Sequence, residues 1–545
     1  MLKKYSSIFI VFFILISAHS VDFSNSKSLY AQITSFTTLQ NEFLEDDFVN
    51  PEEMKLARYF ILVSEDTSRE GELLNFYLTK SNELQEKLYT LHGNFNVNLL
   101  NDSEKYKIGD SINTLLHEIF FIKYNLLSDR ISELKDKGLF NCVSSSILYS
   151  ICMFKYGFLT RAIETKDHVF VSVQIGNSFI DVETTNRFGF EPGTKKDFLN
   201  EFGKTTGFTY VPQKNYNDRY EIDLKKLFLL VSHNLATNLT REKNYLKAAN
   251  IGYFIKTGRN DTKGDEEYFT YFTNYVKNLA REKKFKTGLD LLSYYLVDNN
   301  FDIRLNPLQY DIMSDLIKST EGLQNLLEIS QYIYEKHQDF IHKDEFRFNE
   351  ILFYLNYKLI NEYNSINDFD KSYTILQTMN SGKNKNDLLN NIFFKISDNA
   401  TKSGDFLSGL KMLENAKQYG FDKTMEYDKY RFTLVNNYIV TLSSNKDFTT
   451  ALDFLKQLDF LSDKRIVFLL KNVYINFGYT LSLANNFEQA ILISNEALQI
   501  VGDDSTIRTN LKFYYYKIIE QSVGTIKEQY KNEAQKRFPA EKGFF

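Results

Sequence analysis

The sequence predicts a predominantly helical protein in which an α+β domain is followed by an all-α solenoid. Three observations lead to this fold class. The chain has 545 residues but only 5 prolines, so long helices meet few breaks. Over one short stretch the hydrophobic period changes from 3.6 to 2 residues, which is typical of strands. In the C-terminal half an aromatic–small–aliphatic pattern recurs about every 40 residues, as in stacked helix pairs.

Composition excludes several functional classes. Apolar residues make up 43% of the chain and charged residues 25%, which is ordinary for a folded protein. With 65 basic and 70 acidic residues, the net charge of −5 indicates no general polycation, and we expect no nucleic-acid partner. Two cysteines are too few for a disulfide framework or a four-thiolate zinc site. The sequence implies no metal and no organic cofactor.

Residues 1–20 are predicted to be a signal peptide. A basic start at 1–4 precedes an apolar run at 8–16, and small residues at 18–20 suit a peptidase that cleaves near Ser20. The apolar run is shorter than the ~20 residues that span a bilayer. We therefore expect an exported protein, periplasmic or extracellular, with no integral membrane span after cleavage. An uncleaved N-terminal membrane anchor is the alternative interpretation.

Residues 21–110 are expected to form a helical support region. Apolar residues recur there at helical spacing: Leu56, Ala57, Phe60, Ile61, Leu84, Leu88 and Leu91. The residues of this region show no pattern that indicates chemistry.

Residues 111–212 are predicted to be the α+β domain, and its helices come first. One helical pattern runs from Leu115 to Ile131. A second helix has Asn141 as its N-cap, because an Asn side chain can accept hydrogen bonds from the first free backbone amides. Gly157 suits the C-terminus of that helix.

The strands of this domain follow directly. Over residues 169–175 and 178–182 the hydrophobic period changes from 3.6 to 2, and Gly176-Asn177 lies between the two segments. A two-residue turn of this kind is typical of a β-hairpin. We therefore expect two antiparallel strands after the second helix.

Cys142 and His168 are the candidates for thiol chemistry. Cys142 falls in the first turn of the helix that Asn141 caps, where free amides and the helix dipole favour negative charge on the sulfur. His168 starts the first hairpin strand and is a candidate proton partner, as in thiol acyl-transfer chemistry. Cys152 lies about 15 Å further along the same helix, beyond disulfide reach, so both thiols should be free. Cys152 is expected to pack as a small hydrophobe.

The hairpin register selects a third group that orients the imidazole. The Gly176-Asn177 turn pairs Ile175 with Ser178, which places Glu183 diagonally across from His168 on the same face. Asp181 is on that face too, one pleat further away. Glu183 is therefore the first choice and Asp181 the alternative, and a β-bulge would reverse that order.

The motifs between about 138 and 212 resemble a known family. They are Gly138-x-x-Asn141-Cys142, Gly157-x-x-x-Arg161, Asp167-His168-x-Phe170 and Phe179-Ile180-Asp181-Val182-Glu183-Thr184-Thr185. Together they resemble the transglutaminase-like superfamily. The resemblance implies a papain-like core with a Cys–His–Asp triad, in which the cysteine starts a helix and the other two residues lie on adjacent strands.

Two departures from the family pattern stand out. Phe179 takes the position of the family's Trp, and the chain contains no Trp. Glu183-Thr184-Thr185 then falls where the family has Asp-Pro-Thr, so the carboxylate arm is one methylene longer. This alignment selects Glu183, as does the hairpin register. The Cys142 backbone amide would be one oxyanion donor, and the sequence does not identify the second.

Residues 221–537 are predicted to be the α-solenoid. The repeating pattern starts at Tyr245, Phe285, Leu323, Phe369, Phe406, Phe448 and Phe487, the Leu323 copy being degenerate. A small residue follows three places later in most copies, which lets two helices approach closely. The repeats resemble tetratricopeptide repeats, with HEAT-like pairs as a minor alternative. A single closing helix is expected at 513–537.

The predicted function is acyl transfer by an exported thiol enzyme. Cys142 would attack an amide or peptide carbonyl with the help of His168, and the thioester would be resolved by water or by an amine. The solenoid would recruit a protein or peptide partner. The alternative is a non-catalytic scaffold or binding protein with an inactive thiol domain. His233, His337 and His342 lack metal-ligand spacing, and the sequence does not set the oligomeric state or the substrate.

Overall fold

The computed structural model describes residues 24–49, 51–166, 168–207, 219–299, 302–337, 345–379, 381–458 and 463–540. These residues are predominantly helical, as predicted. They fall into two compact units: the first ends at Lys318, and the second starts at the next residue, with 336–337 grouped with the first. The predicted signal peptide at 1–20 lies outside the described residues, as do Asp167 and 208–212.

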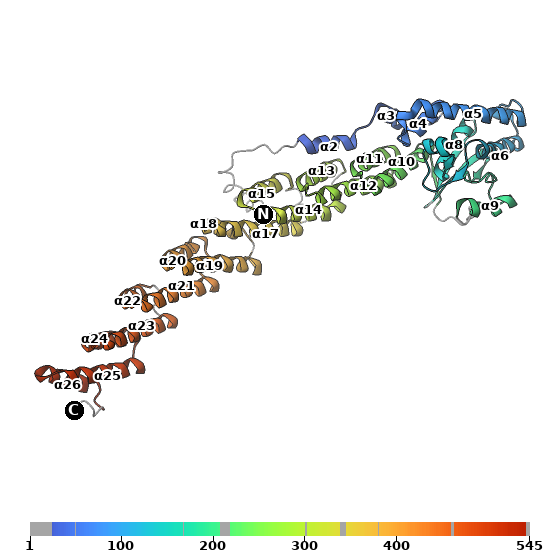
Figure 1. Ribbon diagram of the computed structural model, residues 1–545. Helices are drawn as coiled ribbons and strands as arrows, with labels where there is room; N and C mark the ends of the chain where they lie inside the picture. The colour runs from blue at the N-terminus through green and yellow to red at the C-terminus, as the bar shows by residue number, and fades with distance from the viewer. Residues whose placement is uncertain are drawn as a thin grey trace. The chain divides into compact units, whose positions relative to one another are not determined.

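Helices open the first unit (Figure 1). They are α2 (Ser24–Thr34), α3 (Thr38–Glu45), α4 (Glu53–Val63), α5 (Glu70–His92) and α6 (Asp102–Ile119). The apolar pattern predicted for this region is buried on α4 and α5, except at Leu91, which is 62% exposed. The region contributes to the same hydrophobic core as the strands that follow.

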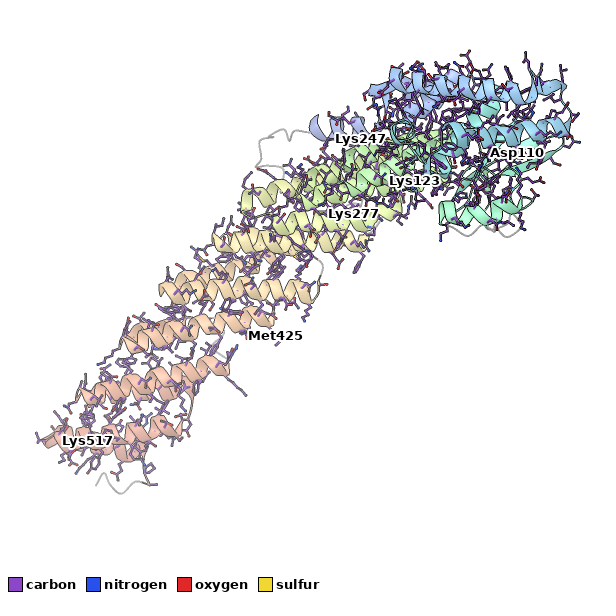
Figure 2. All side chains as sticks on the ribbon, turned by 45° about the vertical axis from the view of Figure 1, so that its right-hand side comes forward. Asp110, Lys123, Lys247, Lys277, Met425 and Lys517 are labelled. Atoms are coloured by element: carbon purple, nitrogen blue, oxygen red, sulfur yellow. The ribbon has the colours of Figure 1, made fainter. Side chains whose placement is uncertain are left out.

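Contacts distant in sequence tie these helices to later ones of the same unit, α11 (Tyr245–Arg259) and α13 (Phe285–Asp298). The Tyr30 hydroxyl of α2 donates to Asp298 Oδ2 at 2.7 Å. Lys247 of α11, labelled in Figure 2, forms an ion pair with Glu65 just after α4. The first unit is therefore held together by contacts that no local pattern encodes.

The predicted helix from Leu115 to Ile131 is wrong beyond the end of α6. The chain there forms β1 (Lys123–Tyr124), then α7 (Ile131–Lys137), and then β2 (Leu139–Phe140), which pairs in parallel with β1. Backbone hydrogen bonds across this pairing replace those of a helix. The predicted domain start at residue 111 also falls inside α6.

A four-stranded sheet and one helix form the centre of the first unit. Their bounds are α8 (Cys142–Lys155), β3 (Thr160–Glu164), β4 (Val169–Ile175), β5 (Ser178–Val182) and β6 (Tyr220–Ile222), and α9 (Lys196–Thr206) lies between β5 and β6 in the chain. The strand order is β5-β4-β3-β6, and all neighbours are antiparallel. α8 packs against β3 and β4. The sequence analysis did not predict β3 and β6.

The predicted hairpin is confirmed in position and register. β4 and β5 flank Gly176-Asn177, and Ile175 pairs with Ser178. Gly176 has a φ of +58°, a left-handed conformation that glycine adopts without strain. α8 also begins directly after Asn141 as predicted, and Gly157 follows its end with a φ of +80°.

Every repeat start predicted from the sequence is the first residue of a helix. These helices are α11, α13, α15 (Leu323–His337), α18 (Phe369–Thr378), α20 (Phe406–Glu414), α22 (Phe448–Lys456) and α24 (Phe487–Val501). The small residues three places later are buried, and a Cβ on Gly409 would lie 2.5 Å from the Cβ of Ala400. Close helix approach therefore explains the small residue of the pattern.

Further helices lie before, between and after these. They are α10 (Leu224–Arg241), α12 (Thr262–Arg281), α14 (Asn306–Ser319), α17 (Glu345–Ser365), α19 (Lys383–Ser403), α21 (Met425–Ser444), α23 (Lys464–Leu483), α25 (Ser505–Gln521) and α26 (Gly524–Arg537). In the second unit, each helix from α17 to α26 packs against the next in a row (Figure 1).

The predicted single closing helix at 513–537 is wrong. It is two helices, because α25 ends at Gln521 and α26 begins at Gly524. Ser522 and Val523 are extended, and Gly524 has a φ of +62°. A β-branched residue followed by glycine favours such a break, since both have low helix propensity.

One described helix, α23, is long and apolar enough to cross a membrane by length and composition. We expected no membrane span after the signal peptide, and this expectation did not take α23 into account. In the second unit, Ile466, Leu470 and Val473 of α23 are buried in a core shared with α22 and α24. The apolar window of α23 is 33% buried, so packing accounts for part of its composition.

Candidate active site

Cys142 is the first residue of α8, and its helix start is firmly capped. The Oδ1 atom of Asn141 accepts hydrogen bonds from the amides of Val143 and Ser144 at 2.9 and 3.1 Å. The Asn141 amide in turn donates to Ser144 Oγ at 3.0 Å, which completes a capping box. The thiol therefore stands at the positive end of the helix dipole.

His168 lies just before β4, and hydrogen bonds from Thr165 hold its backbone. Its carbonyl accepts hydrogen bonds from the amide and the hydroxyl of Thr165, at 2.8 and 3.0 Å. Its Nε2 lies 2.7 Å from Glu183 Oε2. Cys142 and His168 line the same cavity. The structure thus brings Cys142, His168 and Glu183 together at one site.

The surroundings of His168 favour the charged form of its imidazole. Burial alone would lower its pKa, but the Glu183 carboxylate and the interaction with Cys142 outweigh burial and raise the pKa well above the ordinary 6.5. An imidazolium between a carboxylate and a sulfur can donate a proton to a leaving group and can stabilise negative charge on the sulfur.

The three residues of the Glu183-Thr184-Thr185 segment make different contacts. Oε1 of Glu183 accepts a hydrogen bond from the Thr185 hydroxyl at 2.7 Å, which leaves Oε2 for His168. The Thr184 hydroxyl lies 2.8 Å from Ser145 Oγ and 3.0 Å from Ser146 Oγ, both on α8. The end of β5 is therefore anchored to the same helix that carries Cys142.

His117 supports the backbone at Thr184, a role that was not predicted from the sequence. Its Nε2 lies 2.9 Å from the Thr184 carbonyl. Burial lowers the pKa of His117 to about 4, so the ring is neutral near pH 7, and its Nε2–H donates to that carbonyl. The signal for this role is absent from the local sequence, because His117 lies 67 residues before Thr184.

Asp181, the alternative third residue, has different partners. Its carboxylate pairs with the Arg219 guanidinium at 2.6 and 2.7 Å and accepts a hydrogen bond from Ser172. Ser172 is directly opposite Asp181 in the hairpin register. Asp181 is thus part of a buried ion pair within the sheet, and Glu183 is the carboxylate that contacts His168.

A cavity of about 270 Å³ opens at Cys142 and His168. Leu126 and Leu127, which are 54% and 63% exposed, line it from the loop before α7. A further part of the wall comes from α10, which contributes His233 and Asn234 among other residues. Asn234 Nδ2 donates to Asp129 Oδ2 at 2.6 Å and so ties α10 to that loop.

The contribution of α10 to this cavity was not predicted from the sequence, in which His233 was expected to be a solenoid residue without metal-ligand spacing. No local pattern places α10 beside α8, because that contact joins segments about 90 residues apart. Among the described residues, no group of three or more His, Cys, Asp or Glu side chains is placed to hold a metal ion.

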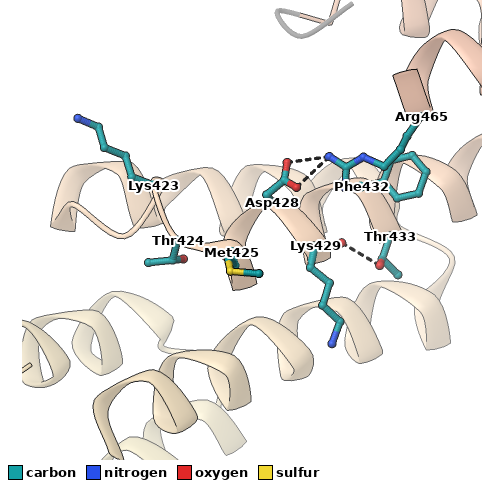
Figure 3. A pocket seen from close by; sticks show the side chains of 8 residues that line it. All are labelled: Lys423, Thr424, Met425, Asp428, Lys429, Phe432, Thr433 and Arg465. Carbon is teal, nitrogen blue, oxygen red and sulfur yellow. Dashed lines mark hydrogen bonds and ion pairs between the residues drawn. The ribbon is translucent and has the colours of Figure 1, made fainter. Parts of the chain in front are cut away.

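A second cavity, of about 520 Å³, lies in the second unit at the start of α21 (Figure 3). There Arg465 pairs with Asp428 at 2.8 Å, and the Thr433 hydroxyl donates to the Lys429 carbonyl at 2.9 Å. Its eight lining residues include neither a cysteine nor a histidine. The thiol–imidazole–carboxylate chain therefore makes the first cavity the better candidate.

Comparisons with known proteins gave no match: the sequence matches no protein-family model and none of the curated proteins with which it was compared.

Proposed function

We propose that the chain is an exported thiol acyl-transfer enzyme of the transglutaminase-like kind. In this proposal the segment around α8 and the sheet is the papain-like catalytic domain, and the helix pairs from α10 onward are a tetratricopeptide-like solenoid that recruits a protein or peptide partner. The signal peptide at 1–20 would direct export.

The observation that carries the proposal is that Cys142 and His168 line one cavity and that the Glu183 carboxylate contacts the His168 ring. A thiol at a capped helix start, a charged imidazole beside it and a buried carboxylate behind the imidazole are the groups that nucleophilic acyl transfer needs. The cavity at the sulfur gives a carbonyl group room to approach.

The proposed reaction has two steps. The Cys142 sulfur attacks an amide carbonyl, the carbon–nitrogen bond breaks, and the imidazolium of His168 gives its proton to the leaving amine. Water or an amine then attacks the thioester and gives its proton to the imidazole of His168, which the first step left neutral, and the sulfur leaves as a thiolate. Glu183 holds the imidazole in place and stabilises its positive charge during the first step.

A burst assay with p-nitrophenyl acetate tests this proposal. We expect wild-type protein to release one equivalent of p-nitrophenolate rapidly and to carry an acetyl group on Cys142 by peptide mass spectrometry. Cys142→Ser and His168→Gln should lose the burst, whereas Cys152→Ala, a matched change on the same helix, should keep it. A wild-type protein without a Cys142-dependent burst would favour the alternative, a non-catalytic binding protein.

A further inference from the structure

The cavity at Cys142 carries an excess of positive charge. Among the described residues that line it, Lys166, Arg241 and Lys263 are cationic at neutral pH, and Glu164 is the only carboxylate. The three cations come from separate elements: the turn between β3 and β4, the end of α10 and the start of α12. The mechanism proposed above gives none of them a task.

Glu164 does not offset this charge, because two cations already contact it. Its side chain is 7% exposed, with Oε1 2.5 Å from Nζ of Lys263 and Oε2 3.2 Å from Nη2 of Arg259. Arg259 also pairs with Asp261, but that carboxylate has a second cation, Lys226, at 2.9 Å. Glu164 and Lys263 therefore form a pair whose charges are compensated within the wall of the cavity.

Lys166 and Arg241 are the cations that remain. Both are exposed, and neither has a carboxylate within ion-pair distance in the described part of the chain. Nη1 of Arg241 donates to Oδ1 of Asn238 at 3.3 Å, a neutral group that also lines the cavity. Glu242 follows Arg241 in the chain but does not line the cavity. A ligand that enters the cavity therefore meets two uncompensated positive charges.

The start of α8 adds to the positive potential. Cys142 and Val143 belong to the first turn of that helix and line the cavity, so the positive end of the helix dipole faces it. Leu126, Leu127 and Leu230 give the wall apolar parts, beside which charges are screened less than in water. A cleft with such walls and one sign of charge concentrates ligands of the opposite sign.

We propose that the cavity selects acyl donors that carry a carboxylate near the reacting carbonyl, and that Lys166 and Arg241 bind this carboxylate. The inference rests on the proposed function, because it names a substrate class for that reaction and leaves the bonds formed and broken unchanged. In a protein or peptide the carboxylate belongs to an acidic side chain or to the chain terminus. The planar guanidinium of Arg241 can bind it through two hydrogen bonds, and Lys166 acts as a point charge.

Three nitrophenyl esters test this selectivity. p-Nitrophenyl hexanoate is neutral, mono-p-nitrophenyl adipate carries a carboxylate on an acyl chain of the same length, and 3-carboxy-4-nitrophenyl hexanoate carries it on the leaving group. Each acylation rate is divided by the rate with free N-acetylcysteine, which corrects for intrinsic reactivity. We expect one of the anionic esters to acylate Cys142 ~10-fold faster than the neutral ester, the low end of electrostatic effects in charged clefts. A preference for the adipate indicates an acidic side chain on the acyl side, and a preference for the third ester indicates a carboxylate on the amine side.

The double variant Lys166→Gln/Arg241→Gln assigns the selectivity to these two residues. It should lose the ~10-fold preference and keep the rate with the neutral ester within about twofold of wild type. Lys263 stays in place because it pairs with Glu164. Arg281→Gln is the matched control and should keep the preference: Arg281 ends α12 as Arg241 ends α10, is also exposed, and does not line the cavity.

Salt gives a second readout that a merely structural role would not move. High ionic strength should lower the preference of the wild-type protein for the anionic ester, because exposed charges are screened, and should leave the rate with the neutral ester unchanged. In the double variant the same salt should change neither rate. An anionic ester whose rate does not respond to salt would contradict the inference.

The outcomes separate this inference from the proposed function. If neither anionic ester is preferred, if the preference survives in the double variant, or if the double variant loses all three rates equally, the two residues do not select the substrate. A burst with the neutral ester that Cys142→Ser abolishes then leaves the proposed function standing. If no ester acylates Cys142, the proposed function fails, and the substrate class falls with it.

Discussion

The two ends of α8 carry the same residue type in opposite settings. Cys142 starts the helix, is 7% exposed and lines a cavity beside His168. Cys152 lies ten residues later, is fully buried, and has its pKa raised to about 12 by burial and by the Glu53 carboxylate. Both thiols are free. Near neutral pH the second sulfur stays a thiol, shielded from reagents.

The difference shows what makes a cysteine a candidate nucleophile. Burial alone does not distinguish the two residues, since both side chains are largely out of solvent. The surroundings distinguish the two residues. Cys142 lies at a capped helix start near the imidazole of His168, whereas Cys152 lies among closely packed apolar side chains.

The largest expected difference is in alkylation. Iodoacetamide should label Cys142 at least ~10²-fold faster than Cys152 in the folded protein, because reaction needs an accessible sulfur with thiolate character. Peptide mass spectrometry of a time course measures both rates in one sample. Unfolding in urea should abolish the difference, and equal labelling of the folded protein would contradict the contrast.

The next effect separates the two candidate carboxylates. Glu183→Gln should slow acylation of Cys142 by ~10²-fold or more, since the imidazolium loses its buried counter-charge. Asp181→Asn should change the rate less than about threefold, because Asp181 pairs with Arg219. The p-nitrophenyl acetate burst measures both. A larger rate effect for Asp181→Asn would reverse the assignment.

Serine substitutions at the two cysteines should differ in stability. Cys152→Ser places a hydroxyl in a fully buried site and should lower the free energy of unfolding by about 1–3 kcal/mol. Cys142→Ser should cost less than about 1 kcal/mol, because the new hydroxyl faces the cavity and His168. Urea unfolding followed by circular dichroism measures both. Equal losses would mean that the two sites do not differ in packing.

A smaller effect follows from the raised pKa of His168. The folded state binds this proton more tightly than the unfolded state, so its contribution to stability is full below pH ~6.5 and is lost as the pH rises through the raised value. The stability difference between wild type and His168→Gln should therefore shrink with increasing pH, by at most about 1.4 kcal/mol per pH unit. Urea titrations at several pH values test this, and a difference that grows with pH would contradict it.

The sequence by itself determined the local features of this protein. Helix starts follow from caps and from the repeating pattern, since Phe369, Phe406, Phe448 and Phe487 each begin a helix. The hairpin register follows from its two-residue turn, and that register placed Glu183 within reach of His168. These features depend on neighbours along the chain, so their physical causes can be read from short segments.

The tertiary structure decided what depends on distant neighbours. β1 pairs with β2 where the apolar pattern predicted that a helix continues. The Asp181 carboxylate forms an ion pair with Arg219. His117 supports Thr184, and α10 brings His233 to the cavity of Cys142. Each of these contacts joins segments that lie far apart in the sequence. Packing, and not local conformation, brings the segments together, so the periodicity of either segment does not predict the contact.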